Sequence, residues 1–285
     1  MQAIRPFIVL VRPKHWLKNG LLFVPILYAR NLFEVDLFLG VVWAFIAFCL
    51  LSSAIYVVND LVDVERDRRH PIKCGRPIAS GQVGRRQAVC LTILLFLGGF
   101  SLAILGSDTI FVFLFALCYV LLNLAYSFRL KHYAIIDCFC IAAGFILRIY
   151  AGGAASHDGI TEWLFLTMTA VSLFLAFGKR RGEMLCVSDA GTTRQVLTRY
   201  NLQFLNGIIF VTAGLAVIFY ALWAMANAAA MVYTVPLVIF IVCRYLLMIH
   251  EANAQGDPTS VILGDSVLLT ALGVFGLLSL AVLYL

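Results

Sequence analysis

The sequence has few charged residues, and this scarcity argues against a soluble globular protein. Only 13% of the 285 residues are Asp, Glu, Lys or Arg, whereas 62% are hydrophobic. A soluble domain usually carries about 25% charged residues. The apolar residues recur in continuous runs, without the two-residue alternation that a membrane β-barrel needs. These features predict an all-α polytopic membrane protein.

Residues that bind zinc or form disulfides are also few or unsuitably spaced. The chain has five histidines, and its eight cysteines contain no CxxC pair. Cys138 and Cys140 would project from different faces of a helix. We therefore interpret the cysteines as apolar packing residues in a reducing or membrane setting. Nothing resembles a nucleic-acid-binding module, so the net charge of +6 favours anionic lipid and phosphate ligands.

Hydropathy predicts nine transmembrane helices in one domain spanning residues 1–285. Their limits are 16–32, 37–59, 88–106, 109–127, 134–152, 162–178, 204–225, 230–249 and 262–284. The first is the least regular, because Lys18, Asn19 and Pro25 interrupt it. Residues 1–15 before it are expected to lie on the membrane surface as an amphipathic segment. No cleavable signal peptide is evident.

The distribution of basic residues predicts the orientation of the chain. Nine helices place the N-terminus and the loops 60–87, 128–133 and 178–203 on the same side. All 21 Lys and Arg residues lie on that side except Arg30 and Arg148. Because short cytoplasmic loops are enriched in Lys and Arg, we expect a cytoplasmic N-terminus and an inner-membrane location. The three loops would then form a cytoplasmic active-site face.

Residues 59–81 are the most informative segment, because acids follow directly on an apolar run. Asn59, Asp63 and Asp67 lie at i, i+4 and i+8, so a continuing helix stacks three oxygen ligands on one face. Asp60 lies beside them. Mg²⁺ takes oxygen ligands and keeps coordination positions open for substrate phosphates. We therefore predict a magnesium site here.

Two cations follow these acids. Arg76 would bind phosphate as a bidentate fork and Lys73 as a point charge. The alternative is a solvated, mixed-charge loop that only fixes topology, and the regular spacing of the acids argues against it.

A second polar cluster lies around the fifth predicted helix. Tyr126 and Lys131 close the fourth helix and its loop, and Asp137 and Arg148 fall inside the fifth. Charges within a membrane are costly, so each should face the interior with a partner. The two are eleven residues apart, about three turns, and would share a helix face and one polar cavity. For Arg148 a purely structural pairing is equally compatible with the sequence.

The third cluster is Gly178-Lys179-Arg180-Arg181-Gly182-Glu183, where the sixth predicted helix ends. Adjacent cations often serve only as a topology anchor. Flanking glycines would let the backbone approach a ligand closely, which favours phosphate binding equally.

The first cluster resembles a signature of the UbiA prenyltransferase superfamily. The matching residues are Asn59-Asp60-x-x-Asp63-x-x-x-Asp67 and Arg76-Pro77-Ile78-Ala79-Ser80-Gly81. The resemblance covers nearly the whole chain. It implies about nine helices around a polar cavity open to the cytoplasmic side, with Mg²⁺ and a diphosphate bound at this motif.

One departure from the usual pattern is informative. Common members carry a second acidic motif after the sixth helix, where this chain has Lys179-Arg180-Arg181. Cations in place of carboxylates favour a phosphate bound without metal. Together with Tyr126-Ser127-x-x-Leu130-Lys131, this cluster resembles the polyprenyl-phosphate (decaprenyl-phosphate) phosphoribosyltransferase branch.

That branch uses phosphoribosyl pyrophosphate as donor and a polyprenyl phosphate lipid as acceptor, in the synthesis of an arabinose donor for the cell envelope. The resemblance implies a Mg²⁺ cofactor on Asn59, Asp63 and Asp67. With Lys73, these three would be the catalytic residues. The residues expected to bind substrate are Lys14, Tyr56, Asp60, Lys73, Arg76, Tyr126, Lys131, Asp137, Arg148, Lys179 and Arg180. Lys131 and Arg148 are the candidates for the lipid phosphate, although donor and acceptor roles are interchangeable among the bases.

Two other functions remain open. The chain would be an ordinary prenyltransferase if it moved a prenyl chain from a diphosphate to an aromatic acceptor, but the missing acidic motif argues against this. A transporter or non-enzymatic lipid-binding protein usually shows internal repeats and broken helices at the midplane, whereas the charges here collect at one end. Lipid length and oligomeric state, including a homo-oligomer, are not specified by the sequence.

Overall fold

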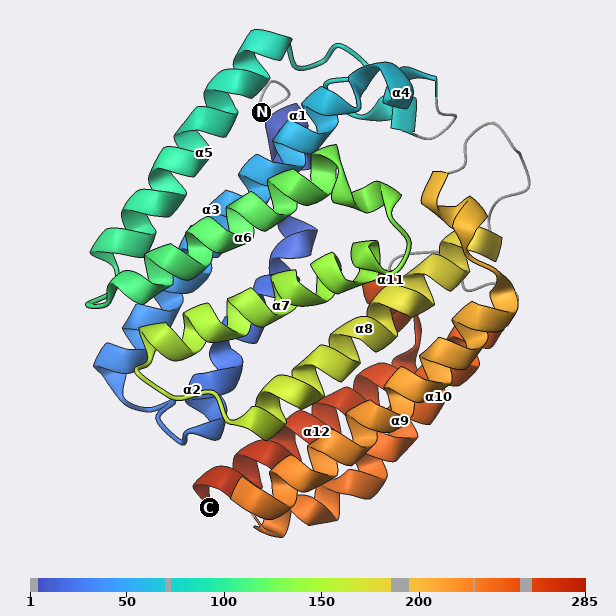
Figure 1. Ribbon diagram of the computed structural model, residues 1–285. Coiled ribbons are helices and arrows are strands. Elements are labelled where there is room, and N and C mark those ends of the chain that lie inside the picture. Colours follow the sequence, from blue (N-terminus) through green and yellow to red (C-terminus); the bar gives the residue numbers. More distant parts are fainter. Residues whose placement is uncertain (1–4, 70–72, 186–194, 228, 252–257) are drawn as a thin grey trace. The chain divides into compact units, whose positions relative to one another are not determined.

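The computed structural model describes residues 5–69, 73–185, 195–227, 229–251 and 258–285. Every regular element among them is helical, which confirms the all-α prediction (Figure 1). Residues 1–4 of the amphipathic segment, 70–72 of the first motif and 186–194 of the third loop lie outside the described residues. The backbone contacts divide the chain into two compact units, unit 1 (1–128 and 147–159) and unit 2 (129–146 and 160–285). The expectation of one domain stays a prediction.

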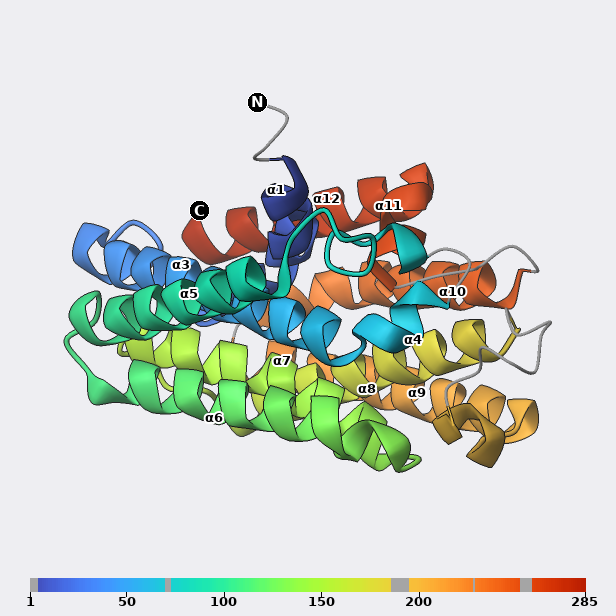
Figure 2. The ribbon, with the colours of Figure 1, turned by 90° about the horizontal axis from the view of Figure 1, so that it is seen from above.

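Unit 1 is built around the longest helix, α3. Its elements are α1 (Arg5–Val11), η1 (Pro13–Phe23), α2 (Val24–Tyr28), α3 (Val35–Val62), α4 (Val64–Arg68), η2 (Lys73–Gly75), α5 (Arg85–Leu105), α6 (Ile110–Phe128) and the second half of α7 (Ile136–Ala155). Figure 2 shows α3 alongside α5. The ideal Cβ of an alanine at Gly99 of α5 would lie 2.6 Å from Leu51 of α3, so the glycine permits this close packing.

Unit 2 contains the first half of α7 and the C-terminal helices. Its other elements are η3 (Leu130–His132), α8 (Glu162–Leu185), η4 (Gln195–Arg199), α9 (Leu202–Asn227), η5 (Ala229–Thr234), α10 (Val235–His250), α11 (Pro258–Gly264) and α12 (Ser266–Tyr284). Helices α8 and α9 form its main packed pair (Figure 2). Its core joins Leu173 and Phe177 of α8 to Leu205 and Ile209 of α9.

Eight helices among the described residues are long and apolar enough to cross a membrane, so the chain is a multi-pass membrane protein. They match the second to ninth predicted helices, and nine transmembrane helices are not confirmed. The predicted helix 16–32 is instead an eleven-residue 3₁₀ helix followed by the five-residue α2. Pro13 begins the first of these and Pro25 lies at the start of the second, which explains why no long α-helix forms.

The broken segment nevertheless runs along α3 inside unit 1. Trp16 donates to Ser53 at 3.0 Å, and Asn19 donates to Cys49 and Ser52 at 3.3 and 3.4 Å. Later residues of η1 therefore contact earlier residues of α3, as expected for an antiparallel neighbour. The two termini of this segment lie at opposite ends of α3.

Candidate functional site

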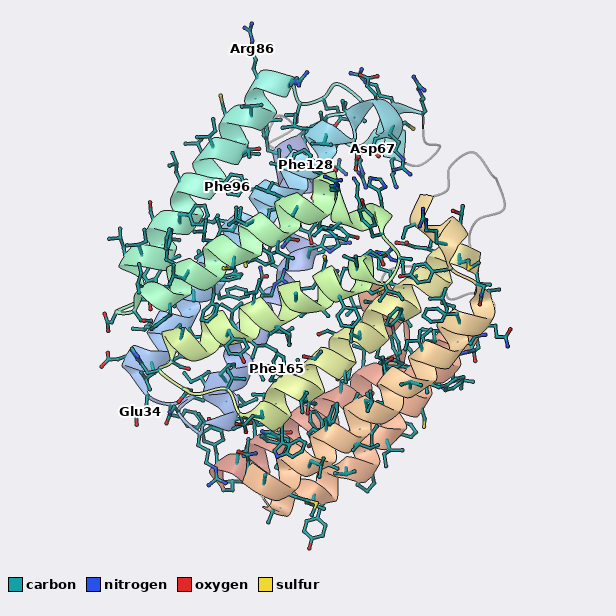
Figure 3. The ribbon with its side chains drawn as sticks, viewed as in Figure 1. Glu34, Asp67, Arg86, Phe96, Phe128 and Phe165 are labelled. Atoms are coloured by element: carbon teal, nitrogen blue, oxygen red, sulfur yellow. The ribbon has the colours of Figure 1, made fainter. Side chains whose placement is uncertain are left out.

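The predicted metal ligands lie where α3 meets α4 in unit 1. Helix α3 ends at Val62, so the helix predicted to continue through Asp63 is interrupted there. The hydrogen-bond pattern persists all the same: Asp63 N–H donates to the carbonyl of Asn59 at 2.9 Å, and Asp67 N–H to that of Asp63 at 2.8 Å. Successive ligands thus remain about one turn apart. Figure 3 shows Asp67 at the same end of unit 1 as Arg86, opposite Glu34.

Arg76 joins two buried carboxylates beside this helix end. Its Nη1 donates to Asp67 Oδ2 at 2.6 Å and to Asp60 Oδ1 at 3.0 Å. The two acids are 4% and 3% exposed, so each needs such a partner. Arg76 therefore lies beside the predicted metal ligands, as expected, and is bound to two acids of the same cluster.

The second partner of Asp60 is Arg12, a residue that no motif in the sequence singles out. Arg12 Nη2 donates to Asp60 Oδ1 at 2.6 Å, and its guanidinium carbon lies 5.0 Å from the ring centroid of Tyr56. Arg12 has φ = 55°, in the left-handed region that non-glycine residues adopt rarely. The signal available in the sequence was an arginine directly before Pro13, at the junction of α1 and η1.

The N-terminal segment thus covers one side of the acidic cluster. The ring of His15 lies 5.1 Å from that of Tyr56, and Lys14 is exposed at the start of η1. Tyr56, which lies on α3 one turn before Asp60, is therefore in contact with Arg12 and His15 of the N-terminal segment. This places Lys14 and Tyr56 on the same part of unit 1 as the predicted metal ligands.

The chemistry of Asn59, Asp63 and Asp67 fits Mg²⁺. One amide and two carboxylates are hard oxygen donors, and Asn59 and Asp63 are half-buried and so reachable. Among the described residues no three His, Cys, Asp or Glu side chains gather as a ready metal site. A metal here would therefore depend on the amide of Asn59 and would share Asp67 with Arg76.

Arg148 belongs to a buried polar network in unit 1. Its Nε donates to Asn19 Oδ1 at 2.7 Å, its Nη2 donates to Tyr119 Oη at 2.7 Å, and its guanidinium carbon lies 4.5 Å from the Tyr119 ring centroid. Arg148 is 6% exposed and Asn19 is fully buried. The bond to Asn19 connects α7 to the broken N-terminal segment. Arg148 therefore has a structural role, which was one of the two alternatives that the sequence left open.

Asp137 and Arg180 form a fully buried ion pair in unit 2. Arg180 Nε donates to Asp137 Oδ2 at 2.5 Å, and its Nη1 also bonds Glu183. The hydroxyl of Tyr200 donates to the other oxygen, Asp137 Oδ1, at 2.7 Å. Burial and this bond raise the pKa of Tyr200, so the hydroxyl stays protonated near neutral pH. The structure therefore brings Asp137 and Arg180 together, two residues predicted from separate clusters.

Asp137 and Arg148 lie eleven residues apart in α7 and so share a helix face, whereas the polar cavity expected to hold both of them stays a prediction. Helix α7 contributes Asp137 to unit 2 and Arg148 to unit 1, and the partners named above lie in different units. Each charge is satisfied within its own network.

The third predicted cluster lies in a helix. Helix α8 continues to Leu185, beyond the predicted end at 178, so residues 178–185 are not part of a loop. Arg181 donates to Asn206 at 2.7 Å and to the carbonyl of Ile249, and it is buried with Arg180. Lys179 is half-buried. Two of the three cations thus pack against neighbouring helices. Lys179 differs from them because successive residues of a helix point in different directions.

The remaining predicted residues lie at helix ends. Lys73 begins η2, Tyr126 is half-buried near the end of α6, and Lys131 is half-buried in η3. Their roles stay predictions.

Comparison with known proteins agrees with this architecture. The model of the UbiA prenyltransferase family matches residues 21–263. The chain belongs to the UbiA prenyltransferase family. A UbiA homologue from Archaeoglobus fulgidus bound to GPP and Mg²⁺ has a TM-score of 0.73 at 18% identity, over 98% of this chain and all of that one.

Curated relatives within the UbiA family carry a narrower name. The decaprenyl-phosphate phosphoribosyltransferase of Mycolicibacterium smegmatis is 35% identical, over 90% of this chain and 86% of the relative. That of Corynebacterium glutamicum is 34% identical, over 90% and 80%. The resemblance stated from the motifs is thereby confirmed.

Proposed function

We propose that this protein transfers the 5-phosphoribosyl group from phosphoribosyl pyrophosphate to a polyprenyl phosphate, with release of pyrophosphate. The observation that carries the proposal is the similarity, over 90% of the chain, to several relatives named decaprenyl-phosphate phosphoribosyltransferase. Lys179 of α8 supports it, because this half-buried cation lies where the resemblance implies a second acidic motif in common members, whereas Arg180 and Arg181 are buried in contacts with protein groups. The product would serve the synthesis of an arabinose donor for the cell envelope.

Asn59, Asp63 and Asp67 would hold Mg²⁺ in this proposal. When bound, the metal would neutralise charge on the diphosphate leaving group. The bond between ribosyl C1 and the diphosphate oxygen breaks with its electron pair on pyrophosphate, and a lipid phosphate oxygen forms the new bond to C1. Since that phosphate is already anionic near neutral pH, the chain needs no strong base.

The basic residues would orient the phosphates of the two substrates. Arg76 is bonded to Asp67, and η2, which begins at Lys73, contacts α4, so both cations would bind the donor diphosphate. Arg76 would do so while held by Asp60 and Asp67, so its guanidinium is oriented in advance. Lys14 and Tyr56 would contact the donor from the same part of unit 1. Tyr126, Lys131 and Arg148 are proposed for the lipid phosphate.

The proposal includes a cytoplasmic N-terminus and an active site facing the cytoplasm. Its basis is the basic-residue distribution, and in unit 1 Asp67 and Arg86 lie at the end opposite Glu34 (Figure 3). A soluble phosphorylated donor is available on that side. Accessibility labelling of single cysteines introduced near Arg86 and Glu34, in inverted vesicles, would test the orientation.

A prenyl transfer reaction is the second candidate, favoured by the fold of the homologue bound to GPP and Mg²⁺. The two reactions differ in which substrate carries the diphosphate. Purified protein would be offered labelled phosphoribosyl pyrophosphate with a polyprenyl phosphate, and in parallel a prenyl diphosphate with an aromatic acceptor. We expect label from phosphoribosyl pyrophosphate to enter the lipid and no prenylated aromatic product to form. Prenylated product without labelled lipid would establish the second candidate.

A further inference from the structure

A hollow of 420 Å³ in unit 2 is lined by Arg129, His132, Tyr133, Thr198 and Arg199. Its walls are η3 and the turn after it on one side and η4 on the other, two segments that contact each other within unit 2. The volume falls in the range of small-molecule sites, roughly 300–1,000 Å³. None of these five residues was selected from the sequence.

The lining is basic and polar. Two guanidinium groups supply forked donors, and Tyr133 and Thr198 add hydroxyls. Within the part of the chain that the structure describes, neither Arg129 nor Arg199 forms an ion pair, and no carboxylate lines the hollow. Two unneutralised arginines facing one space attract an anion, and guanidinium forks match the oxygens of phosphate better than those of most other anions.

The backbone around the hollow is fixed before any ligand arrives. The hydroxyl of Tyr200, next to Arg199, accepts from the Ile135 N–H at 2.6 Å and donates to Asp137 at 2.7 Å. Ile135 has φ = 70°, a strained conformation for a β-branched residue. Such strain persists only where surrounding contacts enforce it, and it is common at binding sites. The Tyr200 bonds hold the η4 wall against the turn that carries Tyr133.

We infer that this hollow is a phosphate-binding pocket, in which Arg129 and Arg199 grip the phosphate and Thr198 and Tyr133 donate to it. The phosphate would belong either to a soluble phosphate ester or to a lipid headgroup. This inference does not rest on the proposed transferase activity.

The test measures equilibrium binding to the full-length protein in detergent, with ³²P-labelled inorganic phosphate and short-chain dioctanoyl phosphatidate as probes. The double variant R129Q/R199Q should weaken the binding of at least one probe about tenfold or more, since each arginine makes charge-assisted bonds. The matched control R85Q/R86Q removes the same charge at the start of α5 and should bind as wild type. Any phosphate bound at the proposed reaction centre would persist in both variants.

The two probes separate the sources of the phosphate. Phosphatidate binding at least tenfold more tightly than inorganic phosphate, and lost in R129Q/R199Q, would identify a lipid headgroup; comparable loss of both would identify a soluble phosphate. Equal binding of both probes by wild type and R129Q/R199Q would overturn the inference. If R129Q/R199Q does not fold, the variant T198V/Y133F removes the hydroxyl donors and retains the charges. Unchanged binding of both probes by T198V/Y133F would also overturn the inference.

Discussion

At the scale of single residues, the three carboxylates Asp60, Asp63 and Asp67 of the acidic cluster differ in how deeply they are buried. Asp60 and Asp67 are buried and bonded to arginines, so their charges are compensated within unit 1. Asp63 is half-buried at the break between α3 and α4, outside the main helix packing. Asp63 is therefore the carboxylate whose loss should affect function most and folding least.

Asp63→Asn should reduce turnover to below about a tenth of wild type, because mutation of a residue that merely orients a metal ligand already costs about ten- to a hundredfold in metal affinity or activity, and loss of the ligand itself costs more. The thermal midpoint of the purified variant should stay close to that of wild type. Initial rates at several Mg²⁺ concentrations provide the measurement. A variant with more than a tenth of the activity at saturating Mg²⁺ would show that Asp63 is not a ligand.

Lys179→Ala should weaken the apparent affinity for the soluble donor about ten- to a hundredfold, the value of one charge-assisted contact of about 1.5–3 kcal/mol. The apparent constant for the lipid acceptor should change much less. Arg85→Ala, at the exposed start of α5, is the matched control. If Lys179 served only as a topology anchor, expression would fall and the donor constant would stay the same.

Arg180→Ala should destabilise the protein by about 3–5 kcal/mol, because it leaves Asp137 buried without its ion-pair partner. Adding Asp137→Asn should recover part of that loss, since an amide is less costly to bury than an unpaired carboxylate. Thermal unfolding of the single and double variants in detergent measures both effects. If Arg180→Ala were as stable as wild type, the Asp137–Arg180 ion pair would not stabilise the fold. Arg180 would then be available to bind a donor phosphate.

The predictability of these residues differed for physical reasons. Asn59, Asp63 and Asp67 follow helical periodicity, and the structure retains that spacing. The partners of Asp60, however, come from the N-terminus and from beyond α4, and Arg12 depends on a left-handed backbone that its sequence does not signal. The Asp137–Arg180 pair joins α7 to α8. A single sequence shows that both residues are charged but does not show that they contact each other.

At the scale of elements, the broken N-terminal segment connects helix packing to the acidic cluster. Segment η1 is held at its middle by the Asn19–Arg148 bond and ends against α7. The ideal Cβ of an alanine at Gly152 would lie 2.0 Å from the carbonyl oxygen of Leu22, so only glycine permits this approach. Since the same segment begins at Arg12, its packing determines where Arg12 reaches Asp60.

Gly152→Ala should therefore lower stability by about 1–3 kcal/mol, the usual cost of overpacking, because backbone atoms of Leu22 must move. Gly214→Ala in α9 is the control: no atom lies within 4 Å of its ideal Cβ, so the change should be neutral or slightly stabilising. Thermal midpoints of both variants in the same detergent decide the matter. A Gly152→Ala protein as stable as the control would show that η1 does not pack this closely.

Long α-helices were predictable and the irregular element was not. The second to ninth predicted helices all appear, because each is a continuous apolar run of about the length that spans a bilayer core. The first contains Pro25 and lies just after Pro13, and its polar residues bond partners on α3 and α7, so its 3₁₀ form depends on those helices. The end of α8 was placed too early because its cations resemble a loop, although two of them are buried in helix contacts.

At the scale of the whole molecule, the chain is a UbiA family member, and curated relatives that match 90% of it are named decaprenyl-phosphate phosphoribosyltransferase. The proposed function therefore depends on which group the protein transfers. The most direct measurement reconstitutes the purified protein with polyprenyl phosphate, Mg²⁺ and phosphoribosyl pyrophosphate labelled in the ribose with ¹⁴C and in the 5-phosphate with ³²P. We expect both labels to enter one lipid product together and Asp63→Asn to abolish this transfer. Lipid that stays unlabelled, in a preparation that prenylates an aromatic acceptor from a prenyl diphosphate, would contradict it.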